Sequence, residues 1–158
     1  MRDFALTLIS LRQANRQDEF VATSDEILSE VSSTQRLLDE LLEVAKGNEI
    51  ELKCRAVDLI GLFGLSVEVF RTKRVEEELL RILSMNYPSE TLKAIALENS
   101  QPTRDNAKPL RQQIAFLLAI LCALSNIKSQ MGRQVAEAIA AEFSGSMLEQ
   151  FILDRTRI

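Results

Sequence analysis

The segment LLEVAKGNEIELKCRAVDLIG, residues 41–61, carries the pattern that decides the fold. It opens with a leucine pair and continues through a short turn at Gly47. An apolar–basic pair, Leu52-Lys53, and a small residue, Ala56, follow the turn. Glycine directly after an apolar periodic run commonly ends a helix. The segment therefore predicts two consecutive helices joined by a tight turn.

This pattern occurs three times along the chain. The leucine pairs begin at Leu41, Leu79 and Leu117, at intervals of 38 residues. The basic residues Lys53, Lys93 and Arg133 recur at intervals of 40, and alanine follows each of them three residues later. Two-helix units that repeat at about 40 residues bury their apolar faces against neighbouring units. The repeat thus predicts a stack of three helical hairpins.

The three segments resemble HEAT repeats, in which a leucine-rich helix, a short turn and an apolar–basic pair precede an alanine-containing helix. The copy at 79–97 keeps the pair ending at Lys93 and keeps Ala96, whereas the third copy has Gly132 at the apolar position. The resemblance covers about two thirds of the chain. It implies an all-α, right-handed superhelical stack of about three HEAT-like hairpins, with a capping helix at each end.

At 158 residues, 46% of them hydrophobic, the chain has the size and the apolar content of one domain with a substantial core. We expect a capping helix within residues 1–22, repeat units at 23–66, 67–108 and 109–145, and a second capping helix within 146–158. The expected helices run at about 3–14, 25–46, 49–65 and 73–85, from 88, at 109–125 and 129–143, and from 146. Gly61 and Gly64 lie inside one of these helices, where they indicate close packing of helices.

The composition argues against most catalytic and metal sites. The chain has no histidine, which removes Ser/His/Asp and Cys/His catalytic sets and histidine-bearing metal sites. Its two cysteines, Cys54 and Cys122, lie in apolar helical runs and are expected to be reduced, buried thiols. We therefore predict a protein that is not an enzyme and has no cofactor, no metal site and no catalytic residues.

The chain's ends and apolar runs bear on its location. The N-terminal segment lacks the uninterrupted apolar centre of a signal peptide. The longest apolar run, 114–124, is shorter than the ~20 residues of a membrane span. We expect an intracellular protein, cytoplasmic or nuclear, with no membrane partner.

The HEAT-like resemblance implies a partner-binding surface on the second helix of each hairpin. We assign to this surface Arg55, Asp58, Lys93, Arg133 and Glu137. A simpler interpretation of Glu51, Arg55 and Asp58 is a row of intrahelical ion pairs worth about 0.2–0.5 kcal/mol each. In HEAT arrays the basic position of each unit also forms a ladder through neighbouring acids, which implies the same for Lys53, Lys93 and Arg133.

A second candidate surface is basic and comprises Arg71, Lys73, Arg74, Arg104, Lys108 and Arg111. Such an edge would suit phosphate or acidic ligands, although the acidic run 76–78 follows at once and favours a simple solvated helix start. The net charge of −4, the single tyrosine and the absence of tryptophan disfavour nucleic-acid binding as the general role.

Together these features predict a protein–protein interaction module, such as a scaffold, an adaptor or a regulatory subunit. The alternatives are a nucleic-acid-associated HEAT-like protein that uses the basic edge, and a homo-oligomeric helical regulator or chaperone. The last would associate through its terminal helices, where Phe20, Val21 and the face of Leu148, Phe151 and Ile152 are apolar. Three units are near the minimum for a stable stack, which would also suit a piece of a longer solenoid.

Overall fold

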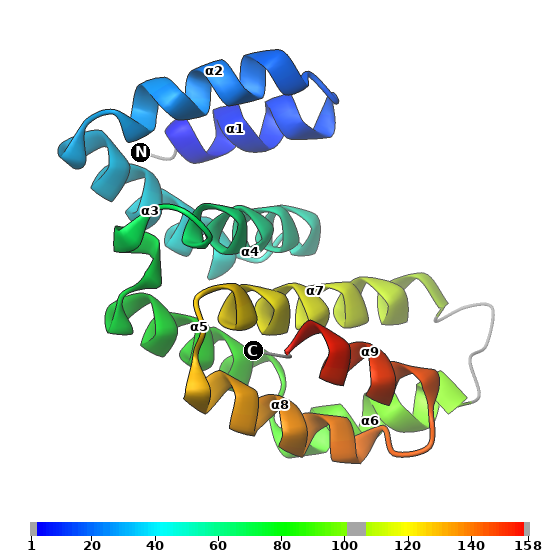
Figure 1. Ribbon diagram of the computed structural model, residues 1–158. Coiled ribbons are helices and arrows are strands. Elements are labelled where there is room, and N and C mark those ends of the chain that lie inside the picture. The colour runs from blue at the N-terminus through cyan, green and yellow to red at the C-terminus, as the bar shows by residue number, and fades with distance from the viewer. Residues whose placement is uncertain (1–2, 101–106, 157–158) are drawn as a thin grey trace.

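The computed structural model describes residues 3–100 and 107–156, and within these ranges the chain is helical, without a strand (Figure 1). The predicted all-α class is confirmed. The helices are α1 (Asp3–Gln13), α2 (Gln17–Leu28), α3 (Val31–Ala45), α4 (Ile50–Gly64), the 3-10 helix η1 (Glu68–Arg71), α5 (Lys73–Asn86), α6 (Ser89–Ser100), α7 (Ala107–Asn126), α8 (Gln130–Glu142) and α9 (Met147–Arg155).

Side-chain caps explain why several expected helix starts agree with the structure. The Thr72 hydroxyl accepts the N–H of Val75 at the start of α5. Ser129 accepts the N–H of Gly132 at 2.8 Å before α8, and Ser146 caps α9 in the same way. Each cap satisfies a backbone donor that the first helical turn leaves without a partner.

The single helix predicted at 25–46 is wrong, because α2 ends at Leu28 and α3 begins at Val31. Ser29, Ser33 and Thr34 donate their hydroxyl hydrogens to backbone carbonyls at the end of α2 and in the turn. Such side-chain bonds compete with continuation of the helix, even where the sequence has no glycine or proline. The boundary predicted after residue 22 therefore falls inside a helix, and the N-terminal cap is the pair α1 and α2.

Figure 1 shows α1 and α2 as an outer layer on α3 and α4, with α4 lying along α7 and with α6, α8 and α9 beyond α7. Helices α4 and α7 run in the same direction, since Gly61 lies at Ala123 and Gly64 at Ile127. A Cβ atom built on Gly61 would lie 3.0 Å from the Cα of Ala123, and one on Gly64 would lie 2.7 Å from the Cγ2 of Ile127. The prediction of close helix packing at both glycines is confirmed. We call this contact the glycine seam.

The middle repeat unit is not arranged as predicted. Helices α5 and α6 do not pack side by side as a hairpin, because α5 packs on α7 while α6 lies against α7 and α8. The Tyr87 hydroxyl donates to the carbonyl oxygen of Gln113 at 2.5 Å, and the Tyr87 and Phe116 rings are 6.1 Å apart. The end of α5 thus lies near the start of α7, and α4 reaches α7 without an intervening unit.

The repeated leucines nevertheless occupy equivalent positions. Leu41, Leu79 and Leu117 lie on α3, α5 and α7, and all three are fully buried. Ala56 and Ala136 are buried as well, on α4 and α8. The repeat therefore identifies most of these core positions, although Ala96 is only partly buried and the repeat does not identify the helices that cover them.

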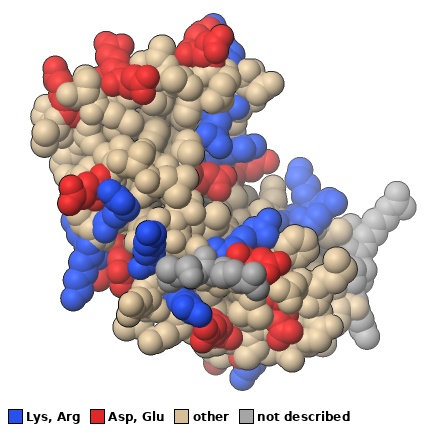
Figure 2. Space-filling model, viewed as in Figure 1, with Lys and Arg blue, Asp and Glu red and all other residues tan. Residues whose placement is uncertain are grey.

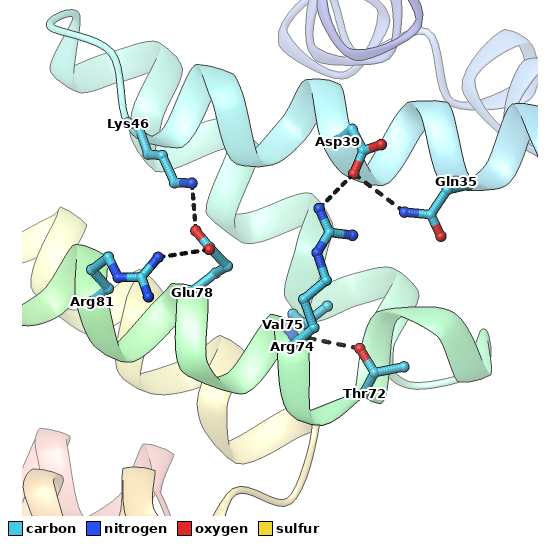
Figure 3. A network of polar contacts seen from close by, with 8 residues as sticks. All are labelled: Gln35, Asp39, Lys46, Thr72, Arg74, Val75, Glu78 and Arg81. Carbon is cyan, nitrogen blue, oxygen red and sulfur yellow. Dashed lines mark hydrogen bonds and ion pairs between the residues drawn. The ribbon is translucent and has the colours of Figure 1, made fainter.

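Between α3 and α5 the chain makes a polar contact, which we call the polar seam (Figure 3). Glu78 of α5 pairs with Lys46, which directly follows α3, and with Arg81 of its own helix at 2.9 Å. Arg74 of α5 pairs with Asp39 of α3 at 2.8 Å. The Lys46 ammonium is the main cause that lowers the pKa of the Glu78 carboxyl. Ion pairs, rather than closely packed backbones, join these two helices.

Helix α7 is the core helix of the C-terminal half. Within the described residues it alone has the length and hydropathy that a membrane crossing would require. Phe116, Leu117, Ile120 and Leu124 are buried inside the protein, against the helices that surround α7. Most of the apolar run 114–124 is thus buried, although Ala115 is exposed and Ile114, Leu118 and Cys122 are partly exposed.

The ends of the structure are only partly apolar at the surface. Phe20, predicted to be exposed, is 4% exposed because its ring stacks on Phe63 with an interplanar angle of 7°. Leu148 and Ile152 of α9 are also buried. Val21 and Phe151 remain exposed. The terminal helices thus use most of their apolar residues to cover the core, which removes much of the surface proposed for self-association.

Candidate functional site

A pocket of about 520 Å³ opens between α4, α7 and α9, and we call it the α4–α7 pocket. It contains two of the five residues that the sequence assigns to partner binding, Arg55 and Asp58. The α4 wall consists of Ile50, Glu51, Cys54, Arg55 and Asp58. The α7 wall consists of Gln112, Ala115, Leu118, Ala119 and Cys122, and Arg155 of α9 completes the rim.

Helical spacing places these residues together. On α4, Glu51, Arg55 and Asp58 share one face at steps of four and three residues, whereas Ala56 and Ile60 are buried on the opposite side. On α7 the same spacing aligns small and apolar residues, so that they form a floor. The close approach of α4 and α7 at the glycine seam sets the two walls side by side.

The charged side chains of the pocket do not pair directly. Within the described residues, no ion pair shorter than 4 Å joins Glu51, Arg55, Asp58 or Arg155 to a group of opposite charge. The interpretation of Glu51, Arg55 and Asp58 as a row of ion pairs is therefore wrong. Figure 2 shows basic and acidic atoms gathered around the hollow between the upper and lower helices. These charges remain available to a bound molecule.

Burial and charge change the pKa values of three pocket groups. Burial, together with the nearby Asp58 carboxylate, raises the pKa of the Cys54 thiol to about 11. Burial also raises the pKa of Cys122, against the opposing effect of Arg155. The pKa of Asp58 is raised by burial, although Arg55 and Arg12 act to lower it. Both thiols are consequently protonated near neutral pH, where a thiol is a weak nucleophile and a poor metal ligand.

The described residues contain no cluster of three or more histidine, cysteine or acidic side chains that could hold a metal ion. The α4–α7 pocket contains the protonated thiols of Cys54 and Cys122 and the carboxyls of Glu51 and Asp58, which do not form such a cluster. The arrangement suits recognition of apolar and charged groups better than it suits metal binding.

The other predicted partner-binding residues lie outside this pocket. Lys93 is exposed on α6, and Arg133 and Glu137 form an exposed pair on α8 with a distance of 3.5 Å. The five residues do not share one pocket, since α4 lies on the opposite side of α7 from α6 and α8 (Figure 1). The sequence repeat places them at equivalent positions, but the altered middle unit separates them in space.

The predicted ladder of basic residues is also not formed. The Lys53 ammonium donates to the Asn86 side-chain oxygen at 3.0 Å and lies 4.8 Å from the centre of the Phe116 ring. Its neighbours are therefore an amide and an aromatic ring instead of an acid, and burial lowers its pKa. Lys53 helps to join α4 to the α5–α7 core and has no counterpart at Lys93 or Arg133.

The basic edge is divided between two places. Arg71 lies beside Gly64, and Gly64 contacts Ile127, just beyond the end of α7. Lys108 and Arg111 lie in the first turns of α7, about 24–28 Å away at the rise of an α-helix. Lys73 and Arg74 begin α5, where Arg74 is paired with Asp39. Arg104 lies outside the described residues. The five described residues thus do not form one continuous edge.

Sequence reasoning missed two features of this region. Arg155 belongs to the C-terminal helix, which was expected to cap the stack or to mediate self-association, and its sequence gives no sign that it reaches the pocket. A further groove of about 420 Å³ lies between α5, α6 and α8. Its lining is mainly apolar and includes Leu80, Leu83, Leu92, Val135 and Ile139. These residues belong to the apolar faces of α5, α6 and α8, but only the packing shows that the three faces line one groove.

Comparison with family models, curated proteins and solved structures finds no match for this chain.

Proposed function

We propose that this chain is a protein–protein interaction module, a scaffold, adaptor or regulatory subunit, and that it binds its partner in the α4–α7 pocket. The observation that carries the proposal is an apolar floor bordered by charged side chains that form no ion pair shorter than 4 Å with any described residue. A partner can bury an apolar side chain on the floor and orient it through the surrounding charges.

The size of the pocket supports this role. A volume of about 520 Å³ accommodates a few side chains of a docking segment. Leu118 and Ala119 offer apolar contact area, while Ala115 is exposed and leaves the mouth open. A well-packed apolar anchor within a polar rim is the usual source of binding energy at protein interfaces.

We propose binding in place of catalysis for two reasons. The raised pKa values of Cys54 and Cys122 leave both thiols protonated near neutral pH, and the chain has no histidine to act as their base.

We also propose that the interaction takes place inside a cell. Both cysteines are free, which agrees with the reducing conditions there.

We also propose that the fold is a modified HEAT-like superhelical stack. The buried leucines on α3, α5 and α7 support a common repeat, and α3 with α4 and α7 with α8 form its regular hairpins. In this proposal the α5–α6 unit has opened, so that its two helices cover α7 and α8 from outside and α4 packs directly on α7. The glycine seam is then a contact between units that are not consecutive.

The proposal can be tested by selecting binders from a displayed library of random 12-residue peptides. The selected clones are measured on the unaltered protein and on Ala115→Trp, which fills the pocket from an exposed helical position. Ala22→Trp on the exposed face of α2 is the matched control. We expect Ala115→Trp to weaken the dominant clones at least tenfold and Ala22→Trp to leave them unchanged. A library that yields no clone sensitive to Ala115→Trp would refute the proposed site.

A further inference from the structure

We propose that the partner segment in the α4–α7 pocket is acidic and apolar, with a carboxylate that contacts Arg55 and Arg155 and an apolar side chain on the α7 floor. This inference rests on the proposed function and names the chemistry of its ligand. It follows from the positions of the charges around the pocket and from the size of the floor residues.

The two arginines come from different walls. Arg55 projects from α4 and Arg155 from the end of α9, and both line the pocket. Within the described part of the chain, neither guanidinium has a carboxylate within 4 Å. The Arg155 guanidinium lies 5.0 Å from the centre of the Phe151 ring, a contact that restrains it without neutralising it. Arginine offers a planar pair of donors that matches a carboxylate.

The residues that line the pocket include two basic and two acidic side chains. Arg12 of α1 acts on Asp58 electrostatically, and with Arg55 and Arg155 it provides three positive charges. Glu51 and Asp58 oppose them on α4. Because both acids lie on α4, Arg155 on the α9 side is available to a ligand carboxylate, which Arg55 can contact as well.

The floor favours an aliphatic or aromatic neighbour for that carboxylate. Ala115 and Ala119 are small, so they leave room beside Leu118 for one large apolar side chain of the partner. A nucleic acid or a small anion would contact the arginines through its charged groups and would leave this apolar area largely uncovered. A peptide segment that carries an acidic residue beside an apolar one uses both the floor and the rim.

The test uses the peptide clones described above together with two defined variants. Arg55→Glu combined with Arg155→Glu reverses the positive rim, and Arg133→Glu on α8 is the control at an exposed arginine outside the pocket. We expect pocket-dependent clones to be enriched in Asp and Glu. Their binding should fall at least tenfold with the double variant, and also when the peptide's own Glu is changed to Gln. Arg133→Glu should have no effect.

Other outcomes overturn the inference in distinguishable ways. If clones depend on Ala115 but are not acidic, or if they tolerate the double variant, the pocket binds a different peptide and only this inference fails. If no clone depends on Ala115, the proposed function fails as well. Binding of a fluorescent 20-nucleotide DNA at low salt, lost in the double variant, would assign the arginines to phosphate instead. Concentration-dependent dimerisation abolished by the double variant would assign them to a second copy of the chain.

Discussion

The two seams of this molecule join helices in opposite ways. At the glycine seam α4 and α7 approach so closely that a Cβ atom on Gly61 or Gly64 would meet a neighbour at 3.0 or 2.7 Å. At the polar seam α3 and α5 are joined by the ion pairs of Glu78 and Arg74 (Figure 3). Close packing leaves little freedom of position, whereas ion pairs near the surface contribute little energy and adjust to small movements. The pocket is built on the rigid seam.

We expect the largest loss of stability from a substitution at the centre of the glycine seam. Gly61→Leu should lower the free energy of unfolding by about 3 kcal/mol or more, because the new side chain meets the backbone of Ala123, which cannot rotate away. The same residue added at an exposed helical position, Ala22→Leu, should change it by less than about 0.5 kcal/mol. Urea unfolding monitored by circular dichroism measures both. Equal values for the two variants would show that α4 and α7 are not closely packed.

Gly64 tests whether the seam depends on one contact. A Cβ atom at this position meets the Cγ2 of Ile127, which is the end of a side chain. We expect Gly64→Ala to destabilise the protein by about 1–2 kcal/mol after the gain in helix propensity is counted. In the background of Ile127→Ala the same change should become neutral or stabilising. A double-mutant cycle measures the coupling, and a coupling near zero would contradict the contact.

Sequence reasoning was most successful where the cause of structure is local. The ends of α4, α5, α7 and α8 lie within about two residues of expectation, and the starts of α5 and α8 are capped by Thr72 and Ser129, which act on their own helix. The burial of Leu41, Leu79 and Leu117 follows from helical periodicity in the same way. The break at residues 29–30 was missed because serine and threonine hydroxyls compete with a helix without excluding it.

Tertiary partners were less accessible to sequence reasoning. Periodicity shows that one face of α4 is buried, but it does not show that α7 covers it in place of α6. Arg55 and Asp58 were identified as candidate binding residues, whereas Arg155 was missed, because its place in the pocket depends on the path of α9.

The sequence did contain a pattern from which α2 could have been predicted as a separate helix. Phe20, Ser24 and Ile27 are spaced as one face of a helix, and all three are buried.

The polar seam should respond to pH through Glu78. Its folded pKa is lowered, chiefly by Lys46, so its contribution to stability is present above the unfolded pKa of about 4.3 and is lost as pH falls through the folded value. Glu78→Gln should cost about 1 kcal/mol near pH 7. The difference from the unaltered protein should disappear in acid. The neighbouring Glu77→Gln, at an exposed position, is the control for a change in net charge. A difference that persists at pH 3 would show that Glu78 acts through packing.

The smallest effect is expected at the second contact of the polar seam. Arg74 and Asp39 are 54% and 52% exposed, and their ion pair of 2.8 Å is open to solvent. A double-mutant cycle with Arg74→Gln and Asp39→Asn should give a coupling of about 0.3 kcal/mol at low salt, which vanishes in about 1 M NaCl because mobile ions screen exposed charges. A coupling above about 1 kcal/mol that survives salt would place this pair on a level with the Gly64–Ile127 contact. Both seams would then stabilise the packing of α5 and α7 against the N-terminal helices. The shape of the pocket would in that case depend on the polar seam as well as on the glycine seam.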